Sequence, residues 1–368
     1  MVGHGRHSTK LMCLWAGLLQ AKFGNRCSMI ERISTQVSPD DTLRAAADIA
    51  PCDSAIKTLA VIGVGAWGSA LAAIAERSEH KIRMWSRRSP ENLADVIAGA
   101  DIVLSAVSMK GVPSVAEQVR QIGLTEGTII VTATKGLDPK TLRTPSKIWQ
   151  DAFPDHPVVV LSGPNLSKEI VQKLPAATVV ASTDIPAAES VQEFFSTDTF
   201  RVYVNTDPIG TELGGTLKNV MAIASGVCDG MKLGTNAKAA LLTRALPEMI
   251  RVGTTLGASA ETFFGLSGLG DLLATCDSPL SRNYQVGFGL ARGKTLVEIL
   301  DQLEGTAEGV NTARVLVRLA NQHEIPIPIS RQVSRLLKGV TTPQEAVQAL
   351  MERDLKPEFC DLFEDDDS

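Results

Sequence analysis

The sequence is poor in cysteine and contains no long apolar run, and each shortage argues against a class of protein. Six cysteines occur among 368 residues, and no two of them form a CxxC pair. They are Cys13, Cys27, Cys52, Cys228, Cys276 and Cys360. Scattered cysteines of this kind favour reduced thiols and a cytoplasmic location over a disulfide framework or a zinc site. No stretch approaches the ~20 apolar residues of a transmembrane helix, so we expect no stable membrane insertion.

Nucleic-acid binding and two kinds of catalysis also lack support. The formal net charge is -5, and no basic run with interleaved aromatic residues is present, so we expect no nucleic-acid partner. The chain has no HExxH motif, no Cys/His cluster and no GxSxG motif. We therefore expect neither a metal site nor a serine nucleophile.

Length and composition predict two globular domains. A chain of 368 residues is too long for one compact core. Its 44% apolar and 21% charged residues are typical of a soluble globular protein. We divide the chain into an extension (1–55), an α/β domain (56–206), a helical domain (207–355) and an acidic tail (356–368).

The first 28 residues resemble a targeting peptide only in part. Their basic residues are Arg6, Lys10, Lys22 and Arg26, and they include no acidic residue. An apolar stretch at 11–19 is soon interrupted by Lys22, and no small-residue cleavage site follows. Met29 offers an alternative start. We therefore interpret residues 1–55 as a disordered or artefactual extension.

Short apolar runs dominate the first half of the chain. Continuous runs, such as TLAVI at 58–62, predict strands that are buried on both faces of a parallel sheet. The predicted strands are 58–62, 81–85, 101–107, 128–134, 157–161, 177–181 and 200–204, with a helix at 69–77. From about residue 206 the pattern changes to Ala/Leu-rich segments with helical spacing, at 208–256 and 284–350.

A glycine-rich turn follows the first predicted strand directly. Gly63-Val64-Gly65-Ala66-Trp67-Gly68 matches GxGxxG and leads into the predicted helix. Glycines here permit a tight turn, and they let the backbone and a helix N-terminus approach a pyrophosphate. The motif is weak by itself, but its place between strand and helix favours dinucleotide binding by Gly63, Gly65 and Gly68. The predicted fold class is therefore α/β, with a Rossmann-like dinucleotide-binding domain followed by an all-helical C-terminal domain.

The end of the second predicted strand indicates which dinucleotide binds. Ser86-Arg87-Arg88 follows this strand, and the first acidic residue is Glu91. An acid at this place binds the ribose 2′-hydroxyl of NAD, whereas arginine accommodates the 2′-phosphate of NADP. Arg87 and Arg88 therefore favour NADP(H). NAD(H) stays open, because arginine can also stack on the adenine of either cofactor.

Polar residues also follow the later strands, at the edge where an open α/β sheet binds ligands. They are Ser108, Lys110, Lys135, Ser162, Gly163 and Asn165. Each lysine taken singly is typical of a surface charge. Several at one edge favour a cleft for an anionic small molecule.

The second half contains a lysine among small and apolar residues, Lys218 in GGTLKNVMAI. A buried ammonium is costly, and burial lowers a lysine pKa toward the range useful for acid–base chemistry. Alternatively, the stem lies on the apolar face and the ammonium snorkels to water. Asp271 precedes an apolar helix and would ordinarily be its N-cap, with Thr275 on the same face. Arg282 and Asn283 suit a phosphate, or else a surface salt bridge.

Together these motifs are similar to those of the NAD(P)-dependent sn-glycerol-3-phosphate dehydrogenases, specifically the bacterial form, over residues 58–352. The matching motifs are VIGVGAWGSALA, VTATKGLD, LSGPNLSKEI, GGTLKNVMAIASGVCDG, GLSGLGDLLATC, SRN and TAEGVNTA. The resemblance implies that Lys218 is the catalytic acid/base, assisted by Lys135 and Asp271. The substrate residues that it implies are Lys135, Gly163, Asn165, Lys218, Asp271, Ser281, Arg282 and Asn283. The cofactor residues that we expect are Gly63, Gly65, Trp67, Gly68, Arg87, Arg88, Lys135, Ser167, Arg282, Thr306 and Glu308.

The sequence departs from the family pattern in three places. Only residues 86–100 separate the second and third predicted strands, whereas most bacterial members carry a longer insertion. The shorter segment affects the cofactor-side wall but none of the residues named above. Ser167 stands where alanine is usual, and the family does not as a rule have the extension at 1–55.

The resemblance implies reversible hydride transfer between the nicotinamide and the carbonyl carbon of dihydroxyacetone phosphate, with the substrate between the two domains. The product, sn-glycerol 3-phosphate, would supply glycerophospholipid synthesis. Two other functions stay open: a two-domain NAD(P)-dependent 3-hydroxy acid dehydrogenase, and a non-catalytic nucleotide sensor. The apolar helical half is consistent with a homodimer.

Overall fold

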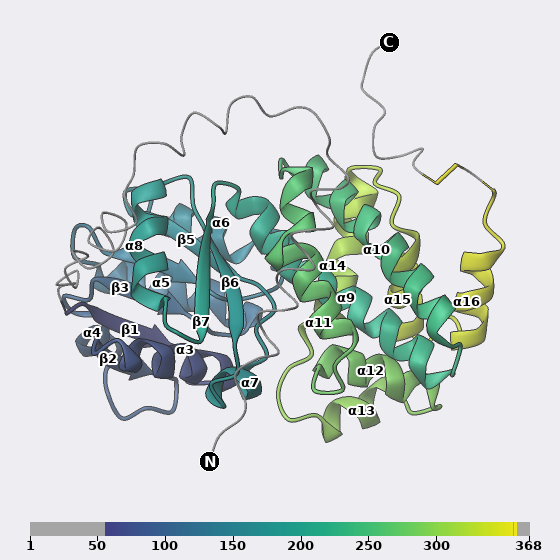
Figure 1. Cartoon of the computed structure of the whole chain (residues 1–368), viewed down its shortest axis with the longest axis horizontal. Coiled ribbons are helices and arrows are strands. Elements are labelled where there is room, and N and C mark those ends of the chain that lie inside the picture. Colours follow the sequence, from purple (N-terminus) through teal and green to yellow (C-terminus); the bar gives the residue numbers. More distant parts are fainter. Residues whose placement is uncertain (1–55, 356, 359–368) are drawn as a thin grey trace, which may run out of the picture. The chain divides into compact units, whose positions relative to one another are not determined.

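A computed structural model describes residues 56–355, 357 and 358 of the chain. The predicted extension, with Met29, and the acidic residues that end the predicted tail lie outside the described residues. In the described part, a seven-stranded sheet is followed by a group of helices (Figure 1). None of the helices in this part is long and apolar enough to cross a membrane.

The first half of the described chain forms one sheet. Its strands are β1 (Thr58–Ile62), β2 (Lys81–Trp85), β3 (Ile102–Ser105), β4 (Ile129–Thr132), β5 (Val158–Ser162), β6 (Ala176–Ala181) and β7 (Phe200–Asn205). They lie in the order β2-β1-β3-β4-β5-β6-β7. The seven predicted strands are confirmed, with small differences at their ends. β1, β3 and β5 are buried along their whole length, as the continuous apolar runs predict.

The prediction of a parallel sheet is wrong for one pair of strands. β1 to β5 run parallel, but β6 is antiparallel to β5, and β7 is parallel to β6. The connection from β5 to β6, residues 163–175, holds one short helix, α7 (Ser167–Val171), and the chain then returns in the opposite direction. A continuous apolar run reports burial on both faces and does not report strand direction.

Helices cover both faces of the sheet, because successive strand residues point to opposite sides. Leu59 and Val61 of β1 belong to a core with α3 and α8, whereas Ala60 and Ile62 belong to a core with α4, α5 and α6. The helices of this half are α3 (Ala66–Arg77), α4 (Leu93–Ile97), η1 (Met109–Gly111), α5 (Val112–Ile122), α6 (Pro145–Ala152), α7 and α8 (Ile185–Phe195). The helix predicted at 69–77 is α3, which begins three residues earlier, at Ala66, inside the glycine-rich turn.

The second half is all-helical, as predicted. Its helices are α9 (Pro208–Gly230), α10 (Thr235–Thr255), η2 (Ala260–Phe264), η3 (Leu266–Gly270), α11 (Asp271–Cys276), α12 (Arg282–Ala291), α13 (Leu296–Gln302), α14 (Glu308–Gln322), α15 (Pro328–Leu337) and α16 (Pro343–Met351). Helix α9 contacts α10, α11, α12, α14 and α15, and also strands β5 and β6. Its packing against α12 is close, because a Cβ atom on Gly226 or Gly287 would collide with the facing backbone. Helix α9 therefore connects the sheet to the helices. The division of the chain at residues 206 and 207 stays a prediction.

Candidate active site

The glycine-rich turn joins β1 to α3 where β1 has β2 on one side and β3 on the other. Gly63 has a φ of 111°, and a Cβ atom there would lie 2.8 Å from the Ala106 carbonyl carbon. A Cβ atom on Gly68 would collide with the Gly63 carbonyl oxygen. Gly65 differs, because it is exposed and a Cβ atom there would meet nothing within 4 Å. Gly63 and Gly68 therefore shape the turn, and Gly65 leaves open space on its surface.

This open space lies at the N-terminus of α3. No side chain caps that end of the helix, so its first N–H groups have no side-chain partner among the described residues. Free N–H groups at a helix N-terminus bind anions, and an open glycine lets a pyrophosphate approach the backbone. Trp67, in the first turn of α3, is half-buried against the core beneath the helix. The turn therefore fits the dinucleotide that the sequence predicts.

Arg87 and Arg88 lie in a turn directly after β2, and both are exposed. The Ser86 amide donates to Ser89 Oγ over 3.0 Å, and the Arg88 amide donates to Ser86 Oγ. These bonds fix the turn at the end of β2, the strand that pairs with β1. Arg87 and Arg88 are therefore exposed at the end of the strand that pairs with β1, the strand that leads into the glycine-rich turn.

Three further predicted cofactor residues begin or precede helices. Ser167 is the first residue of α7, Thr306 is exposed just before α14, and Glu308 is the first residue of α14. Burial raises the pKa of Glu308, while a hydrogen bond from the Met109 amide and the charge of Arg282 lower it. Glu308 therefore ties α14 to the segment after β3 and lies within electrostatic reach of Arg282.

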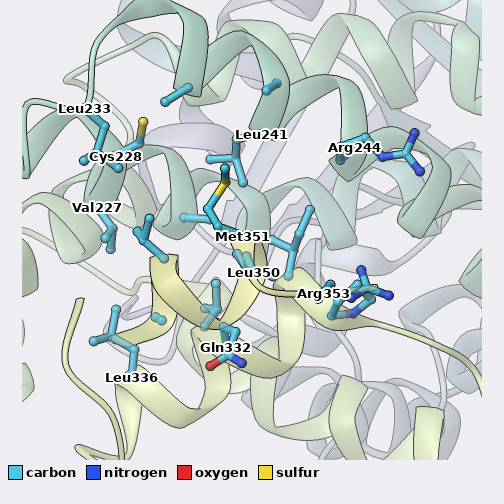
Figure 2. A pocket seen from close by; sticks show the side chains of 18 of the residues that line it. Val227, Cys228, Leu233, Leu241, Arg244, Gln332, Leu336, Leu350, Met351 and Arg353 are labelled. Carbon is cyan, nitrogen blue, oxygen red and sulfur yellow. The ribbon is translucent and has the colours of Figure 1, made fainter. Parts of the chain in front are cut away.

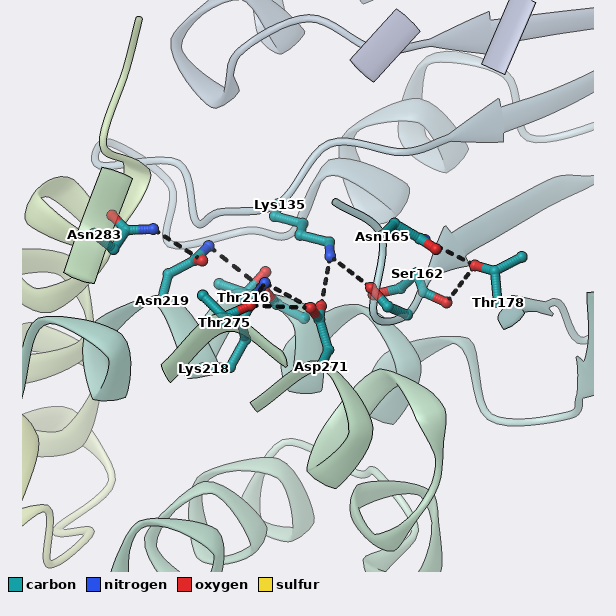
Figure 3. Close-up of polar contacts among 12 residues, drawn as sticks. Lys135, Ser162, Asn165, Thr178, Thr216, Lys218, Asn219, Asp271, Thr275 and Asn283 are labelled. Carbon is teal, nitrogen blue, oxygen red and sulfur yellow. Dashed lines mark hydrogen bonds and ion pairs between the residues drawn. The ribbon is translucent and has the colours of Figure 1, made fainter. Parts of the chain in front are cut away.

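Three charged side chains from distant parts of the sequence meet beside α9 (Figure 3). Lys218 Nζ lies 2.6 Å from Asp271 Oδ1, and Lys135 Nζ lies 2.5 Å from Asp271 Oδ2. Lys135 also donates to the Gly163 carbonyl oxygen over 3.2 Å, and Lys218 donates to the Thr275 hydroxyl. One carboxylate therefore pairs with two ammonium groups, one from α9 and one from the segment after β4.

The protonation of Lys218 follows from this arrangement. Only 9% of the Lys218 side chain and 2% of the Asp271 side chain are exposed, against 20% for Lys135. Burial lowers the pKa of Lys218 to about 8; Asp271 opposes the shift, and the charge of Lys135 adds to it. A group that titrates near the working pH can both donate and accept a proton, as acid–base catalysis requires.

The structure contradicts two interpretations of single residues. Lys218 does not snorkel to water, because α9 is buried along most of its length and the ammonium bonds to Asp271 and Thr275. Asp271 is not an N-cap: Gly270 holds that position in α11, and the Asp271 carboxylate faces the two lysines. The predicted proximity of Thr275 is confirmed, since its hydroxyl donates to Asp271 Oδ1 over 3.2 Å.

Small residues of α9 let the segment after β4 approach the charged cluster formed by Lys135, Lys218 and Asp271. A Cβ atom on Gly215 would collide with Ser162 Oγ and would lie 3.2 Å from Lys135 Cε. The next residue, Thr216, accepts a hydrogen bond from the Gly136 amide over 2.9 Å. Gly215 therefore makes room for Lys135, and Thr216 fixes the backbone beside it. Thr216 could not be identified from the sequence, where its only signal is a hydroxyl within a buried helix.

Two buried polar atoms near Lys135 lack partners. Asn165 Nδ2 donates to Thr178 Oγ1 over 2.9 Å, and this hydroxyl donates to the Ser162 carbonyl oxygen (Figure 3). Asn165 Oδ1 and Ser162 Oγ are buried without a hydrogen-bond partner among the described residues. A buried polar atom without a partner is costly, so both atoms are candidates for binding a polar ligand.

The segment Ser281-Arg282-Asn283 has no hydrogen bond to the charged cluster. Ser281 Oγ accepts from the Tyr284 amide and caps α12. Asn283 is buried; its Nδ2 donates to Asn219 Oδ1 over 3.0 Å, and its Oδ1 accepts from a backbone amide of α14. Arg282 is exposed at the start of α12. The structure therefore places Asn283 against Asn219, the neighbour of Lys218, and leaves Arg282 exposed with its guanidinium beside Gly305.

A separate cavity of about 460 Å³ lies in the helical half (Figure 2). It is mostly apolar, with Leu241, Leu336 and Leu350 in its walls and Arg244 and Arg353 toward one side. None of the predicted site residues lines it. In the part of the chain that the structure describes, no three His, Cys, Asp or Glu side chains are grouped to hold a metal ion. The cluster around Asp271 is therefore the candidate active site.

The matching family models and the sequence relatives name the same family. Residues 207–348 match the family model described as NAD-dependent glycerol-3-phosphate dehydrogenase C-terminus, and residues 58–91 and 88–188 match that of the N-terminus. A glycerol-3-phosphate dehydrogenase (NAD(P)+) of Acaryochloris marina is 67% identical over 305 residues, which cover 83% of this chain and 98% of that protein. The protein of the same name from Nostoc sp. is 65% identical over 302 residues, or 82% and 98%. A crystal structure of glycerol-3-phosphate dehydrogenase from Coxiella burnetii is 34% identical with a TM-score of 0.78, covering 81% of this chain and 99% of that chain.

Proposed function

The chain belongs to the NAD-dependent glycerol-3-phosphate dehydrogenase family, and we propose that it reversibly reduces dihydroxyacetone phosphate to sn-glycerol 3-phosphate. The observation that carries this proposal is the pairing of Lys135 and Lys218 with one buried carboxylate, Asp271. An anionic substrate meets two ammonium groups there, and the carboxylate offsets part of their charge.

Lys218 acts as the proton donor in reduction. When bound, NAD(P)H supplies a hydride that adds to the substrate's carbonyl carbon. The C=O π electrons move onto the oxygen, and Lys218 Nζ gives a proton to that oxygen to complete the alcohol. In the reverse direction the neutral amine of Lys218 takes the hydroxyl proton. A pKa of about 8 makes both forms of Lys218 accessible near neutral pH.

Lys135 and Asp271 support this step. The Lys135 ammonium, which is more exposed than that of Lys218, stabilises negative charge as it develops on the substrate oxygen. Asp271 holds both ammonium groups in place. Near Lys135, the unpaired Asn165 Oδ1 and Ser162 Oγ are suited to the substrate hydroxyl, and Gly163 contributes the backbone between them.

Arg282 is the proposed anchor of the substrate phosphate. Its guanidinium is exposed at the start of α12, and a fork of N–H donors matches phosphate oxygens. Ser281 fixes that helix start by capping it. Asn283 uses one N–H group on Asn219, and this leaves its second N–H for the phosphate.

We propose NADP(H) as the preferred cofactor, with NAD(H) also accepted. Gly63, Gly65 and Gly68 would hold the pyrophosphate at the N-terminus of α3. Arg87 and Arg88, exposed after β2, would hold the 2′-phosphate that distinguishes NADP(H). Trp67, Ser167, Thr306 and Glu308 complete the proposed set of cofactor residues.

The decisive experiment follows NADPH absorbance after dihydroxyacetone phosphate is added to the purified protein, and then repeats the assay with NADH. We expect oxidation of both cofactors, faster with NADPH at low concentration. A 3-oxo acid as substrate tests the alternative hydroxy-acid dehydrogenase and should give no reaction. Absence of oxidation with dihydroxyacetone phosphate and either cofactor would contradict the proposed function.

We also propose that the enzyme works in the cytoplasm, supplies glycerophospholipid synthesis and forms a homodimer. We retain the division into a cofactor domain (56–206) and a substrate domain (207–355). Light scattering of the purified protein tests the dimer, because it measures molar mass directly. A mass of one chain would contradict that part of the proposal.

A further inference from the structure

Helix α9 also carries a buried acid, Glu212, six residues before Lys218 in the sequence. Glu212 is 2% exposed. Its Oε1 accepts a hydrogen bond from the Ser146 amide over 2.9 Å, and its Oε2 accepts one from the Ser146 hydroxyl. The Thr144 hydroxyl bonds to the same carboxylate. Glu212 therefore binds the start of α6, a helix that packs against the sheet.

The start of α6 is suited to a carboxylate. Thr144 is the N-cap, and Pro145 is the first helical residue and has no N–H group. The Ser146 amide is thus the first N–H group of the helix, at the positive end of its dipole, and it points to Glu212. Burial raises the pKa of Glu212 to about 7, against the hydrogen bonds from Ser146, so the position is costly for an acid.

The segment between Lys135 and α6 is held on α9 at both ends. At the first end, the Gly136 amide donates to Thr216 Oγ1. At the second end, Ser146 donates twice to Glu212. Positions 212 and 216 are four residues apart and so lie on the same face of the helix. Both anchors of the Lys135 segment therefore belong to the helix that carries Lys218.

We propose that Glu212 is a positioning residue, which anchors the segment 135–146 on α9 and so keeps Lys135 paired with Asp271 beside Lys218. The inference rests on the roles proposed above for the two lysines. The titratable groups that face Lys218 are Lys135, Asp271 and Cys276. Because Lys135 is the cation among them, its displacement would raise the pKa of Lys218 and remove a charge from the substrate oxygen.

The test compares Glu212→Gln with a matched control, Glu248→Gln. Glu248 is also a buried carboxylate, 1% exposed, that accepts two backbone N–H bonds at a helix start, here Ile329 and Ser330 of α15. It belongs to no part of the proposed site. Ser146→Ala, which keeps Glu212 and its hydrogen bonds from the Ser146 amide and the Thr144 hydroxyl, serves as a milder variant in case Glu212→Gln does not fold.

Three readouts separate positioning from a structural role: kcat for dihydroxyacetone phosphate reduction against pH, the NADPH dissociation constant, and the melting temperature. For Glu212→Gln we expect kcat to fall about 10- to 100-fold, as for a small misplacement of a catalytic group, with nearly unchanged NADPH binding. The pH at which reduction declines should rise, and Lys135→Met should raise it likewise. Ser146→Ala should show smaller changes of the same sign, and Glu248→Gln should alter only the melting temperature.

A double variant tests most directly whether Glu212 acts through Lys135. If Glu212 acts through Lys135, the double variant Glu212→Gln/Lys135→Met should be little worse than Lys135→Met. Multiplied losses in the double variant, or wild-type pH profiles in both Glu212→Gln and Ser146→Ala, would overturn the inference. An inactive wild-type protein would instead contradict the proposed function.

Discussion

Replacement of Asp271 by asparagine should remove the charge that holds two ammonium groups together. Asp271 lies 2.6 Å from Lys218 Nζ and 2.5 Å from Lys135 Nζ. Asparagine keeps the shape, but its amide group presents N–H donors, so one lysine would face a donor instead of an acceptor. Asp271 is also the strongest influence that raises the pKa of Lys218, against burial and Lys135. The pKa of Lys218 should therefore fall further in the variant.

The size of the effect follows from the loss of a buried pair. Unit charges about 3 Å apart attract by about 5 kcal/mol at an effective dielectric constant of about 20. Removing one partner of a buried pair costs about 3–5 kcal/mol in practice. A loss of about 3 kcal/mol lowers the pKa of Lys218 by about two units. The protonated fraction at pH 7 then drops from about 0.9 to about 0.1, and reduction slows about tenfold.

The assay is the rate of NADPH oxidation with dihydroxyacetone phosphate, measured against pH. In the wild type the rate should decline as pH rises through about 8, where Lys218 loses its proton. In Asp271→Asn the decline should move to lower pH, and activity should partly recover as the pH falls. Asp277→Asn is the control, because Asp277 follows the same helix but is 85% exposed and pairs with Lys238. A decline at the wild-type pH or above it in Asp271→Asn would refute the reasoning.

Three further changes test the proposed roles. Lys218→Arg keeps the charge, but an arginine does not deprotonate near neutral pH; oxidation of sn-glycerol 3-phosphate should fall at least about 100-fold, and equal rates would contradict acid–base catalysis. Arg282→Gln should raise the KM for dihydroxyacetone phosphate about tenfold or more while kcat changes little, and steady-state kinetics would show otherwise if the phosphate binds elsewhere. Arg87→Ala with Arg88→Ala should raise the KM for NADPH much more than that for NADH; equal increases would exclude recognition of the 2′-phosphate.

The sheet could be predicted from the sequence because burial of a strand is a local property. The run TLAVI at 58–62 becomes β1, buried along its whole length. The direction of β6 could not be predicted in this way. Strand direction depends on how residues 163–175 return to the sheet, and an apolar run looks the same in either direction. The glycine-rich turn was easier, because its residues, its strand and its helix are adjacent in the sequence.

The contacts of the candidate site, unlike the strands, could not be predicted from local sequence. Lys218 draws attention in the sequence, but its partners Asp271 and Lys135 lie far away along the chain, and no spacing rule connects them. Only the family resemblance placed the three together. Asn283 illustrates the same limit, because an amide suited to a phosphate also suits another amide, and in the fold it bonds to Asn219. Residue type indicates what a side chain can bind, and the fold decides what it meets.

Helix α9 is buried on nearly every side, and for such a helix the residues that have distant partners can be identified from the sequence. Water cannot satisfy polar groups there, so a polar side chain is costly unless another segment supplies a partner. Thr211 Oγ1 is buried without a hydrogen-bond partner among the described residues, but most of the buried polar side chains of α9 have one. The partners of α9 are Ser146 for Glu212, Gly136 for Thr216, Asp271 for Lys218, Asn283 for Asn219 and the Cys276 carbonyl for Ser225. These contacts join α9 to the segment after β4 and to α6, α11 and α12. Polar residues within a small and apolar helical stretch can therefore be taken, from the sequence, as the places where other segments dock. Glu212 in GTELGGTLKN was open to this interpretation before its partner was known.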